Sequence, residues 1–449
     1  MNFPLLKIIM PIWYYYLPNK NENLYWTNYN NLTSEQKKHI DYPNNLYIDQ
    51  NMIEFDIIFQ AFNLGFISQK LEKSNFTISS LNEIPLKDQY TFIRRMHKTI
   101  WVYYTFIIRI LTLNNFLTEI RCFIKTRKIK KIKLKHPLNH LDLYKNFQSR
   151  ILLQNPMISI IIPTLNRYKY LKILLNNLEH QDYQNFEVII IDQSRPFKKK
   201  FYDQFNLGIN LVYLKQRALW KARNEGVKIS KGEFLLFLDD DSAIKKNFIS
   251  EHLKCIDYYK CDISSGVSIS TVGAPIPYNY SYFRWSDQLD TGNVLIKKNV
   301  FRICGLFDTK FDKMRMGDAE FGARAFINNF TIISNPIASR SHLKIEIGGL
   351  REMGSWDGLR PVNFFSPRPI PSVLYLFKKY WGKNATLLYL LKTIPISVGP
   401  YKFKGRIKGY FISIFLFSLF FPVILIQIVI SWYRSNELLN SKSKIKHIE

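Results

Sequence analysis

Three consecutive aspartates directly follow an apolar run in the middle of the chain. Asp239, Asp240 and Asp241 come after Phe-Leu-Leu-Phe-Leu at 234–238. Adjacent carboxylates repel one another and are costly to hold together without a cation. At a strand end, Asp239 and Asp241 point to the same side, because side chains alternate with a period of two. Such oxygen ligands suit Mg²⁺ or Mn²⁺, which usually bridge substrate phosphates. The triplet therefore predicts a divalent-cation site that serves a diphosphate.

Two other apolar runs also end in polar or unusual residues. Residues 158–162 are followed by Pro163 and Thr164, and residues 188–191 are followed by Asp192. Short, nearly continuous apolar runs are typical of strands that are buried on both faces of an α/β sheet. Ligands of open α/β sheets bind outside the carboxyl ends of the strands. We therefore expect these strand ends and the aspartate triplet to line one crevice.

Helical patterns separate the predicted strands. Leucines at 171, 174, 175 and 178 repeat with the spacing of one helix face, and residues 219–230 form a second helical candidate. Strands that alternate with helices predict right-handed crossovers and a mainly parallel sheet flanked by helices.

Residues 156–345 resemble a family 2 glycosyltransferase of the GT-A fold. The resemblance rests on several motifs in order, namely IIIPTLNRYKYL, IIIDQS, KARNEGVKISKGEFLLFLDDDS, TGNVLIKKNVFRICGLFD and GDAEFGAR. It implies an enzyme that uses a nucleotide-diphospho-sugar donor, with a UDP-sugar expected. A nucleotidyltransferase on a related sheet would instead carry a Gly-rich, basic phosphate loop after the first strand, and this sequence has none there.

The resemblance also implies roles for the residues of the donor site. Pro163 and Thr164 would line the nucleotide pocket, and Asp192 would hydrogen-bond the base. Arg223 and Asn224 would lie on the helix that supports the donor.

The aspartate triplet matches the DxD motif of the family. Asp239 would lie nearer the ribose and Asp241 would bind the metal, with Asp239 and His342 as further candidate ligands. Asp240 is assigned to the donor site, and three aspartates in a row leave the register open by one residue.

Asp318 matches the second residue of the Glu-Asp catalytic motif of the family. The resemblance implies that it is the general base, which takes the proton from the acceptor hydroxyl. A helix N-cap is a compatible second role. Gly317 stands where the family has Glu, a departure for which Glu320 is the candidate to compensate.

The resemblance extends to residues on either side of this base. His342 would complete the metal shell or contact the diphosphate, with a purely structural role as the alternative. Arg351 would pair with the diphosphate through two hydrogen bonds, or form a surface salt bridge. Gly292 and Asn293 resemble the segment that lines the acceptor side, where Trp285 would stack on a sugar.

The ends of the chain differ from this region. We expect residues 1–150 to be a mostly helical, basic accessory region, and 346–408 to be a C-terminal extension. Residues 409–433 carry no charge and as one helix would measure about 37 Å, against ~30 Å of hydrocarbon. Pro422 near the middle also fits a segment that re-enters, so both arrangements are predicted. Residues 434–449 form a basic tail.

The formal charge is +28, from 63 basic and 35 acidic residues. This charge favours an anionic partner such as a membrane surface, although Lys, Asn, Ile, Phe and Tyr are also what an AT-rich genome would supply. The basic run at 125–135 predicts contact with lipid headgroups or a solvated linker. The basic residues form no recognisable nucleic-acid module, so no nucleic-acid partner is predicted. Four scattered cysteines without a CxxC pair fit a reducing compartment and argue against a zinc cluster.

The resemblance implies a glycosyltransferase that acts by single displacement with inversion. Bacterial nucleotide sugars are cytosolic, so we expect the catalytic region at the cytoplasmic face of the cell membrane. The acceptor would be a lipid-linked glycan or a growing surface polysaccharide. The alternative is a catalytically weak, membrane-associated scaffold, which Gly317 alone supports.

Overall fold

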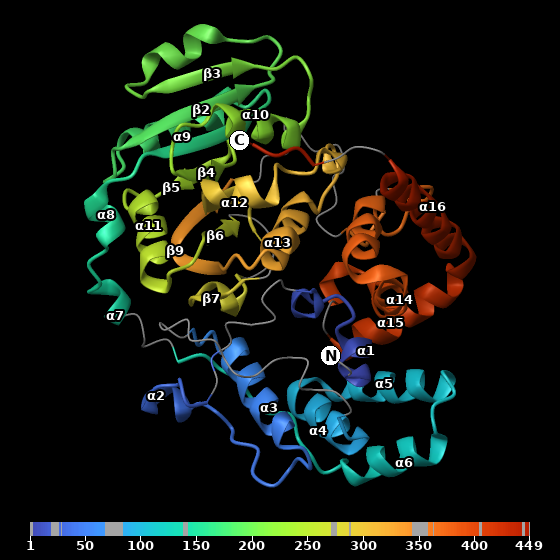
Figure 1. Ribbon diagram of the computed structural model, residues 1–449. Helices are drawn as coiled ribbons and strands as arrows, with labels where there is room; N and C mark the ends of the chain where they lie inside the picture. Colours follow the sequence, from blue (N-terminus) through green and yellow to red (C-terminus); the bar gives the residue numbers. More distant parts are fainter. Residues whose placement is uncertain are drawn as a thin grey trace. The chain divides into compact units, whose positions relative to one another are not determined.

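The computed structural model of the protein describes residues 3–18, 27, 29–67, 84–137, 142–270, 276–286, 289–343, 358–361, 363–403, 406–441 and 445–448. The chain divides into two compact units (Figure 1). Residues 1–137 and 355–439 form the first unit, which we call the helical unit. Residues 138–354 and 440–449 form the second, which we call the sheet unit.

The sheet unit is built on one nine-stranded sheet. The spatial order is β3-β2-β1-β4-β8-β6-β9-β5, and β7 pairs with β9. Every residue of β1 and β4 is buried, which agrees with their continuous apolar sequence. The first four strands in this order are parallel, and Thr164 at the end of β1 lies opposite Asp192 at the end of β2. Their bounds are β1 Ile158–Thr164, β2 Phe186–Asp192, β3 Ile209–Tyr213 and β4 Phe234–Leu238.

The other half of the sheet corrects the prediction of a mainly parallel sheet. β8 runs antiparallel to both β4 and β6, and β5 and β7 run antiparallel to β9. The sheet is therefore mixed, and only its first half is wholly parallel. β8 has a short apolar core like that of the parallel strands β1, β2 and β4, so composition alone does not reveal its direction. These strands are β5 Ser242–Ile244, β6 Ile263–Ser270, β7 Arg284–Trp285, β8 Asn293–Lys297 and β9 Ile332–His342.

Helices connect and flank the strands. α9 turns the predicted leucine face inward, with all four leucines buried, and α10 begins at Leu219 as its pattern predicts. α13 begins at Gly317 and carries Asp318 in its first turn. The helices of the sheet unit are α7 Asp142–Lys145, α8 Arg150–Gln154, α9 Tyr168–Glu179, α10 Leu219–Ile229, α11 Phe248–Tyr259, α12 Lys298–Cys304 and α13 Gly317–Ile327.

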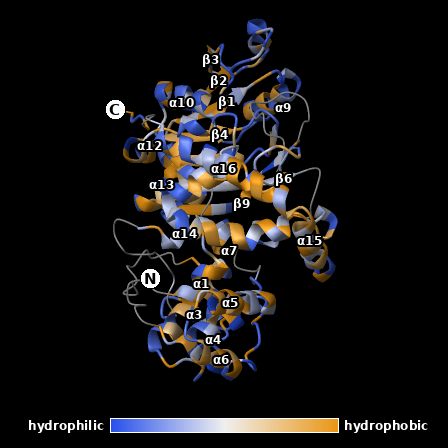
Figure 2. Ribbon diagram, turned by 90° about the vertical axis from the view of Figure 1, so that its right-hand side faces the viewer, coloured by the Kyte–Doolittle hydropathy of each residue, from blue (hydrophilic) through white to orange (hydrophobic). Residues whose placement is uncertain are grey.

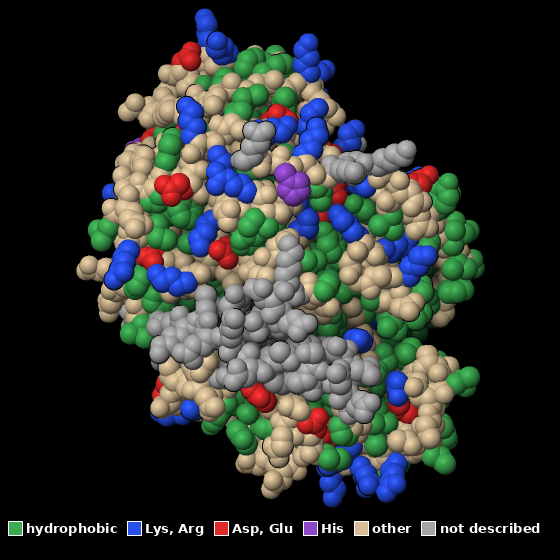
Figure 3. Space-filling view, in the orientation of Figure 1, with side chains coloured by type: hydrophobic (Ala, Val, Ile, Leu, Met, Phe, Trp, Pro, Cys, Tyr) green, Lys and Arg blue, Asp and Glu red, His purple; other side chains and the backbone are tan. Residues whose placement is uncertain are grey.

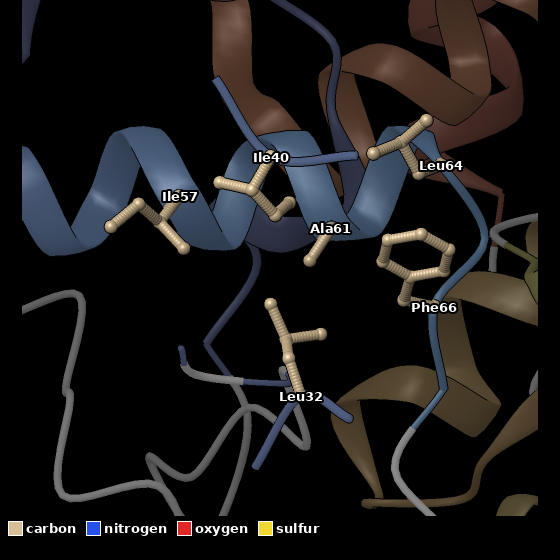
Figure 4. Close-up of a cluster of buried hydrophobic side chains, with 6 residues drawn as sticks. All are labelled: Leu32, Ile40, Ile57, Ala61, Leu64 and Phe66. Carbon is tan, nitrogen blue, oxygen red and sulfur yellow. The ribbon is translucent and has the colours of Figure 1, made fainter. Parts of the chain in front are cut away.

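The regular elements described in the helical unit are all helices. The helices before residue 137 pack around aromatic and aliphatic side chains. One cluster of buried apolar side chains includes Ala61 of α3 (Figure 4). α14 joins this part of the chain, because Trp381 Nε1 donates to the carbonyl of Trp13 at 2.8 Å. The bounds are α1 Pro4–Ile9, α2 Ser34–Lys37, α3 Gln50–Asn63, α4 Leu86–Met96, α5 Thr99–Leu111, α6 Phe116–Lys125, α14 Pro371–Ser397, α15 Ile407–Leu419 and α16 Phe421–Asn440.

The apolar segment predicted at 409–433 is not one helix. It forms the end of one helix, α15, and the beginning of another, α16, with an 83° bend between them. Pro422 explains the break, because it has no N–H to donate and its ring clashes with the preceding turn. Among the described residues, no single helix has the length and apolar character needed to cross a bilayer, whereas α15 and α16 together meet these criteria.

Candidate active site

The carboxyl ends of β1 and β4 meet as the sequence predicts. Thr164 Oγ1 donates to Asp240 Oδ2 at 2.8 Å. Pro163 is buried within β1, directly opposite Ile191 of β2. The aspartate triplet therefore lies at the edge of the sheet where α/β proteins bind ligands.

Arg167, which follows β1, bridges two carboxylates of the triplet. Its Nη1 lies 3.2 Å from Asp240 Oδ1 and 3.1 Å from Asp241 Oδ2. Burial raises the pKa of Asp240 to about 7, with Arg167 opposing this rise and Asp241 adding to it. Asp240 is thus held inside the protein by Thr164 and Arg167.

Two further arginines hold Asp239. Arg223 of α10 donates to its Oδ1 at 2.8 Å, and Arg340 of β9 donates to its Oδ2 at 3.1 Å. Burial disfavours the charge on Arg340, but Asp290 and Asp239 hold its pKa above the usual value. A Cβ on Gly292 would lie 2.2 Å from Asp239 Oδ2 and 2.3 Å from Arg340 Nη2. Gly292 therefore makes room for this ion pair.

Asp241 and His342 form the part of the site that fits a metal ion. Asp241 Oδ1 is buried and has no hydrogen-bond partner among the described residues. His342 Nε2 lies 3.3 Å from Asp241 Oδ2. No group of three His, Cys, Asp or Glu side chains suited to a metal is found in the described part of the chain. One carboxylate and one imidazole fit a cation that takes its remaining ligands from a diphosphate and water.

The residue before Asp318, Gly317, packs against α10. A Cβ on Gly317 would lie 2.4 Å from Cε2 and Cζ2 of Trp220, so the indole occupies the space beside the start of α13. The Trp220 ring also stacks on the guanidinium of Arg223, 4.9 Å away, which contacts Asp239. These contacts link the start of α13 to Asp239 through Trp220 and Arg223, and the indole leaves no space for a side chain at residue 317.

Glu320, the candidate to compensate for Gly317, is engaged in an ion pair within its own helix. It is fully buried, and its Oε2 accepts hydrogen bonds from Arg324 Nε at 3.1 Å and Nη2 at 2.9 Å. The carboxylate is thus paired one turn further along α13.

Asp192 and Asn224 are buried and hydrogen-bonded to other parts of the sheet unit. Asp192 Oδ2 accepts from Tyr168 at 2.7 Å and from Tyr202 at 2.8 Å. The Asn224 amide pairs with both backbone groups of Phe307, each at 2.9 Å.

The residues assigned to the acceptor side are also buried. The Asn293 side chain accepts from His252 and donates to two backbone carbonyls. Trp285 is 8% exposed. Arg351 lies outside the described residues.

Sequence reasoning did not identify Arg167, Arg340 or Trp220 as site residues. Arg167 has a signal, because it lies in the loop directly after a marked strand end. No pattern in the sequence marks Arg340 or Trp220, since only folding brings them near the triplet. The Arg340 guanidinium also donates to Ser242 Oγ at 2.7 Å and Ser268 Oγ at 2.6 Å, so it ties β9 to two other strands.

Comparison with known proteins finds a family model and several relatives that are similar to part of this chain. Residues 159–311 match the family model described as Glycosyl transferase family 2. A poly(ribitol-phosphate) β-N-acetylglucosaminyltransferase, TarS of Staphylococcus aureus, is 33% identical over 112 residues, which cover 23% of this chain and 20% of the relative. A PGL/p-HBAD biosynthesis glycosyltransferase of Mycobacterium tuberculosis is 26% identical over 222 residues, covering 44% of this chain and 78% of the relative.

Solved structures match more distantly. The crystal structure of S. aureus TarS 1–349 in complex with UDP-GlcNAc is 16% identical with a TM-score of 0.41, covering 63% of this chain and 89% of that chain. The chain matches about a fifth of the length of the curated staphylococcal relative.

Proposed function

We propose that this chain, whose residues 159–311 match the model of glycosyltransferase family 2, transfers a sugar from a nucleotide-diphospho-sugar to an acceptor hydroxyl with inversion. A UDP-sugar is the proposed donor. The observation that carries the proposal is the meeting of Thr164, the aspartate triplet and His342 at the carboxyl edge of the sheet. An edge of this kind suits a bound nucleotide and its diphosphate.

Asp318 is the proposed general base. It takes the proton of the acceptor hydroxyl while that oxygen forms a bond to the anomeric carbon. The bond between the anomeric carbon and the diphosphate oxygen breaks, and its electron pair leaves with the nucleoside diphosphate. A single displacement of this kind inverts the anomeric carbon.

Asp241 and His342 are the proposed protein ligands of Mg²⁺ or Mn²⁺. Such a cation, when bound, offsets the negative charge that develops on the departing diphosphate. Arg223 and Arg340 hold the Asp239 carboxylate in place from two sides. Preorganised charges of this kind act without rearranging during the reaction.

We further propose a role in cell-surface glycan synthesis at the cytoplasmic face of a bacterial membrane, with a glycan or lipid-linked acceptor. The names of the staphylococcal and mycobacterial relatives support sugar transfer of this class. On this proposal residues 156–345 perform catalysis, and the helical unit, residues 1–137 and 355–439, is the accessory and membrane-facing part.

The test is donor binding and hydrolysis across a panel of nucleotide sugars, with Mn²⁺ or EDTA, for the wild type and Asp318→Asn. We expect metal-dependent turnover of one donor, and its loss in Asp318→Asn with donor affinity retained. Asp203→Asn, a carboxylate of the same unit outside the proposed site, is the matched control. A folded protein that binds no donor in the presence of metal would overturn the proposal and favour a scaffold.

A further inference from the structure

α15 has the reverse of the pattern expected for a helix on the surface of a water-soluble domain. The residues that it buries are the small Gly409 and Ser413. Ser413 Oγ lies 3.3 Å from the carbonyl of Ile396 in α14. The outward face carries large apolar side chains at the spacing of one helical stripe, namely Ile407, Phe411, Ile414, Phe415 and Leu419. Phe411 is 71% exposed and Phe415 is 67% exposed.

α16 repeats this reversed pattern. Its buried side includes Gln427 and Ser435, beside the apolar Ile424. Gln427 Nε2 donates to the carbonyl of Phe364 at 2.7 Å, and Ser435 Oγ accepts from Lys378 Nζ at 2.7 Å. Its exposed apolar residues are Leu425, Ile426, Val429 and Tyr433. Figure 3 shows hydrophobic side chains gathered at the right-hand margin over α16.

A second apolar stripe in the helical unit comes from the other end of the chain. α5 and the turn into α6 expose Ile100, Tyr103, Ile107, Leu111, Leu113, Phe116 and Leu117. Leu113 at the turn is 93% exposed. The Trp101 and Tyr410 rings, whose centroids lie 6.5 Å apart, bring α5 beside α15. Figure 2 shows hydrophobic residues along both helices.

The segments that carry these stripes are strongly basic. Residues 358–436 contain eleven Lys and Arg and no Asp or Glu, and residues 98–136 contain ten Lys and Arg and one Glu. Exposed apolar faces rimmed by basic residues complement a bilayer whose headgroups are anionic. A protein partner would need to match two stripes and a strongly basic rim, whereas a lipid surface matches both by its nature.

We propose that the helical unit binds the surface of an anionic bilayer through the outward faces of α5, α6, α15 and α16, which we call the apolar platform. Apolar side chains leave water for the acyl region, while the basic residues meet the headgroups. The small and polar residues of α15 and α16 face the protein, where Ser413 and Ser435 contact α14 and Gln427 bonds to Phe364. This proposal rests on the proposed function and adds the surface through which the protein would bind a membrane. Binding through the platform does not require catalysis.

The test is sedimentation of the full chain with vesicles of phosphatidylcholine, with and without phosphatidylglycerol. We expect binding that requires phosphatidylglycerol and weakens as salt is added. Two variants remove apolar surface at separate points, Phe411→Ser with Phe415→Ser in α15, and Leu113→Ser with Leu117→Ser at the turn. Each pair should weaken binding about tenfold or more. The control, Ile48→Ser with Leu153→Ser, changes exposed apolar residues outside the platform and should bind like the wild type.

Far-UV circular dichroism and the thermal midpoint establish that each variant is folded, as expected for exposed positions. The proposal is overturned if the wild type does not bind anionic vesicles, or if both platform variants bind them as the wild type does. A wild type that is dimeric in mild detergent and becomes monomeric in the platform variants would assign these faces to a protein interface instead. Donor hydrolysis in the same samples separates failure of this proposal from failure of the glycosyltransferase proposal.

Discussion

At the scale of single residues, charge pairing explains how three adjacent aspartates are held at one strand end. Arg167 pairs with Asp240 and Asp241, while Arg223 and Arg340 pair with Asp239. The sequence predicted the aspartates, because they follow a marked strand. It did not predict Arg340, since that residue lies 101 positions from Asp239 and reaches it only when β9 has joined the sheet.

A substitution at Gly317 tests whether the Trp220 indole requires a glycine at this position. In Gly317→Ala the new Cβ would lie 2.4 Å from the indole, so either the ring or the start of α13 must move. We expect a loss of about 1–3 kcal/mol in the free energy of unfolding, as for other overpacked sites. Urea unfolding measures it, and turnover should fall because Asp318 is displaced.

The matched control is Gly208→Ala, where an added Cβ meets no atom within 4 Å. Its free energy of unfolding should change by no more than about 0.5 kcal/mol. A double variant with Trp220→Leu should show a coupling of more than about 1 kcal/mol with Gly317→Ala. Additive effects would mean that the indole does not determine the residue type at 317.

At the scale of secondary structure, continuous apolar runs and helical spacing located the elements that carry the site. The predicted runs at 158–162, 188–191 and 234–238 lie within β1, β2 and β4, and the predicted helix at 219–230 matches α10. Strand direction was predicted less well, because β8 has the short apolar run that is typical of a parallel strand but runs antiparallel to its neighbours. Direction depends on how the chain returns to the sheet, which local composition does not encode.

The buried His252 of α11 should make the stability of the sheet unit depend on pH. Its Nε2 lies 3.0 Å from Asn293 Oδ1, which can only accept, so Nε2 carries the proton and Nδ1 accepts from Ser264 at 2.9 Å. Burial lowers the pKa of His252 to about 4. In the unfolded chain the histidine pKa is near 6.5, so the ring takes up its second proton there at a higher pH than in the folded protein. Stability is lost between about pH 6.5 and 4, by up to about 3 kcal/mol.

The measurement is urea unfolding at intervals between pH 7 and 4, for the wild type and His252→Gln. The variant lacks the titrating ring, so its free energy of unfolding should depend less on pH across this window, even if it is lower at pH 7. His180→Gln, an exposed histidine of the same unit, should retain the wild-type dependence. Parallel curves for the wild type and His252→Gln would contradict the assignment.

At the scale of the whole molecule, the two units are interleaved along the chain. The helical unit takes its residues from 1–137 and 355–439, and the chain then returns to the sheet unit at 440–449. Sequence patterns marked the apolar and basic segments at both ends but gave no sign that they share one unit. That grouping arises from long-range packing, such as the hydrogen bond from Trp381 to Trp13.

The returning segment should stabilise the loop that packs against α10, the helix that carries Arg223 and Asn224. The amide of Leu306 donates to the carbonyl of Lys446 at 2.7 Å, and Lys310 Nζ donates to the carbonyl of Ser441 at 3.0 Å. Phe307 in the same loop pairs with Asn224 of α10, one residue from Arg223. The end of the chain is thus linked to Asp239 through a loop and a helix.

Removal of residues 445–449 should therefore weaken both stability and donor binding. Loss of the Leu306–Lys446 hydrogen bond and the packing around it would lower the thermal midpoint of the sheet unit by about 2–4 °C. Donor affinity should fall several-fold, because Arg223 and Asn224 lose support. Lys446→Ala is the matched control, since it keeps the carbonyl that accepts the bond and should behave as the wild type. A shortened chain with an unchanged midpoint and unchanged donor affinity would show that α10 is held by its other contacts alone, chiefly the bonds of Trp220 to Phe311 and Asp312.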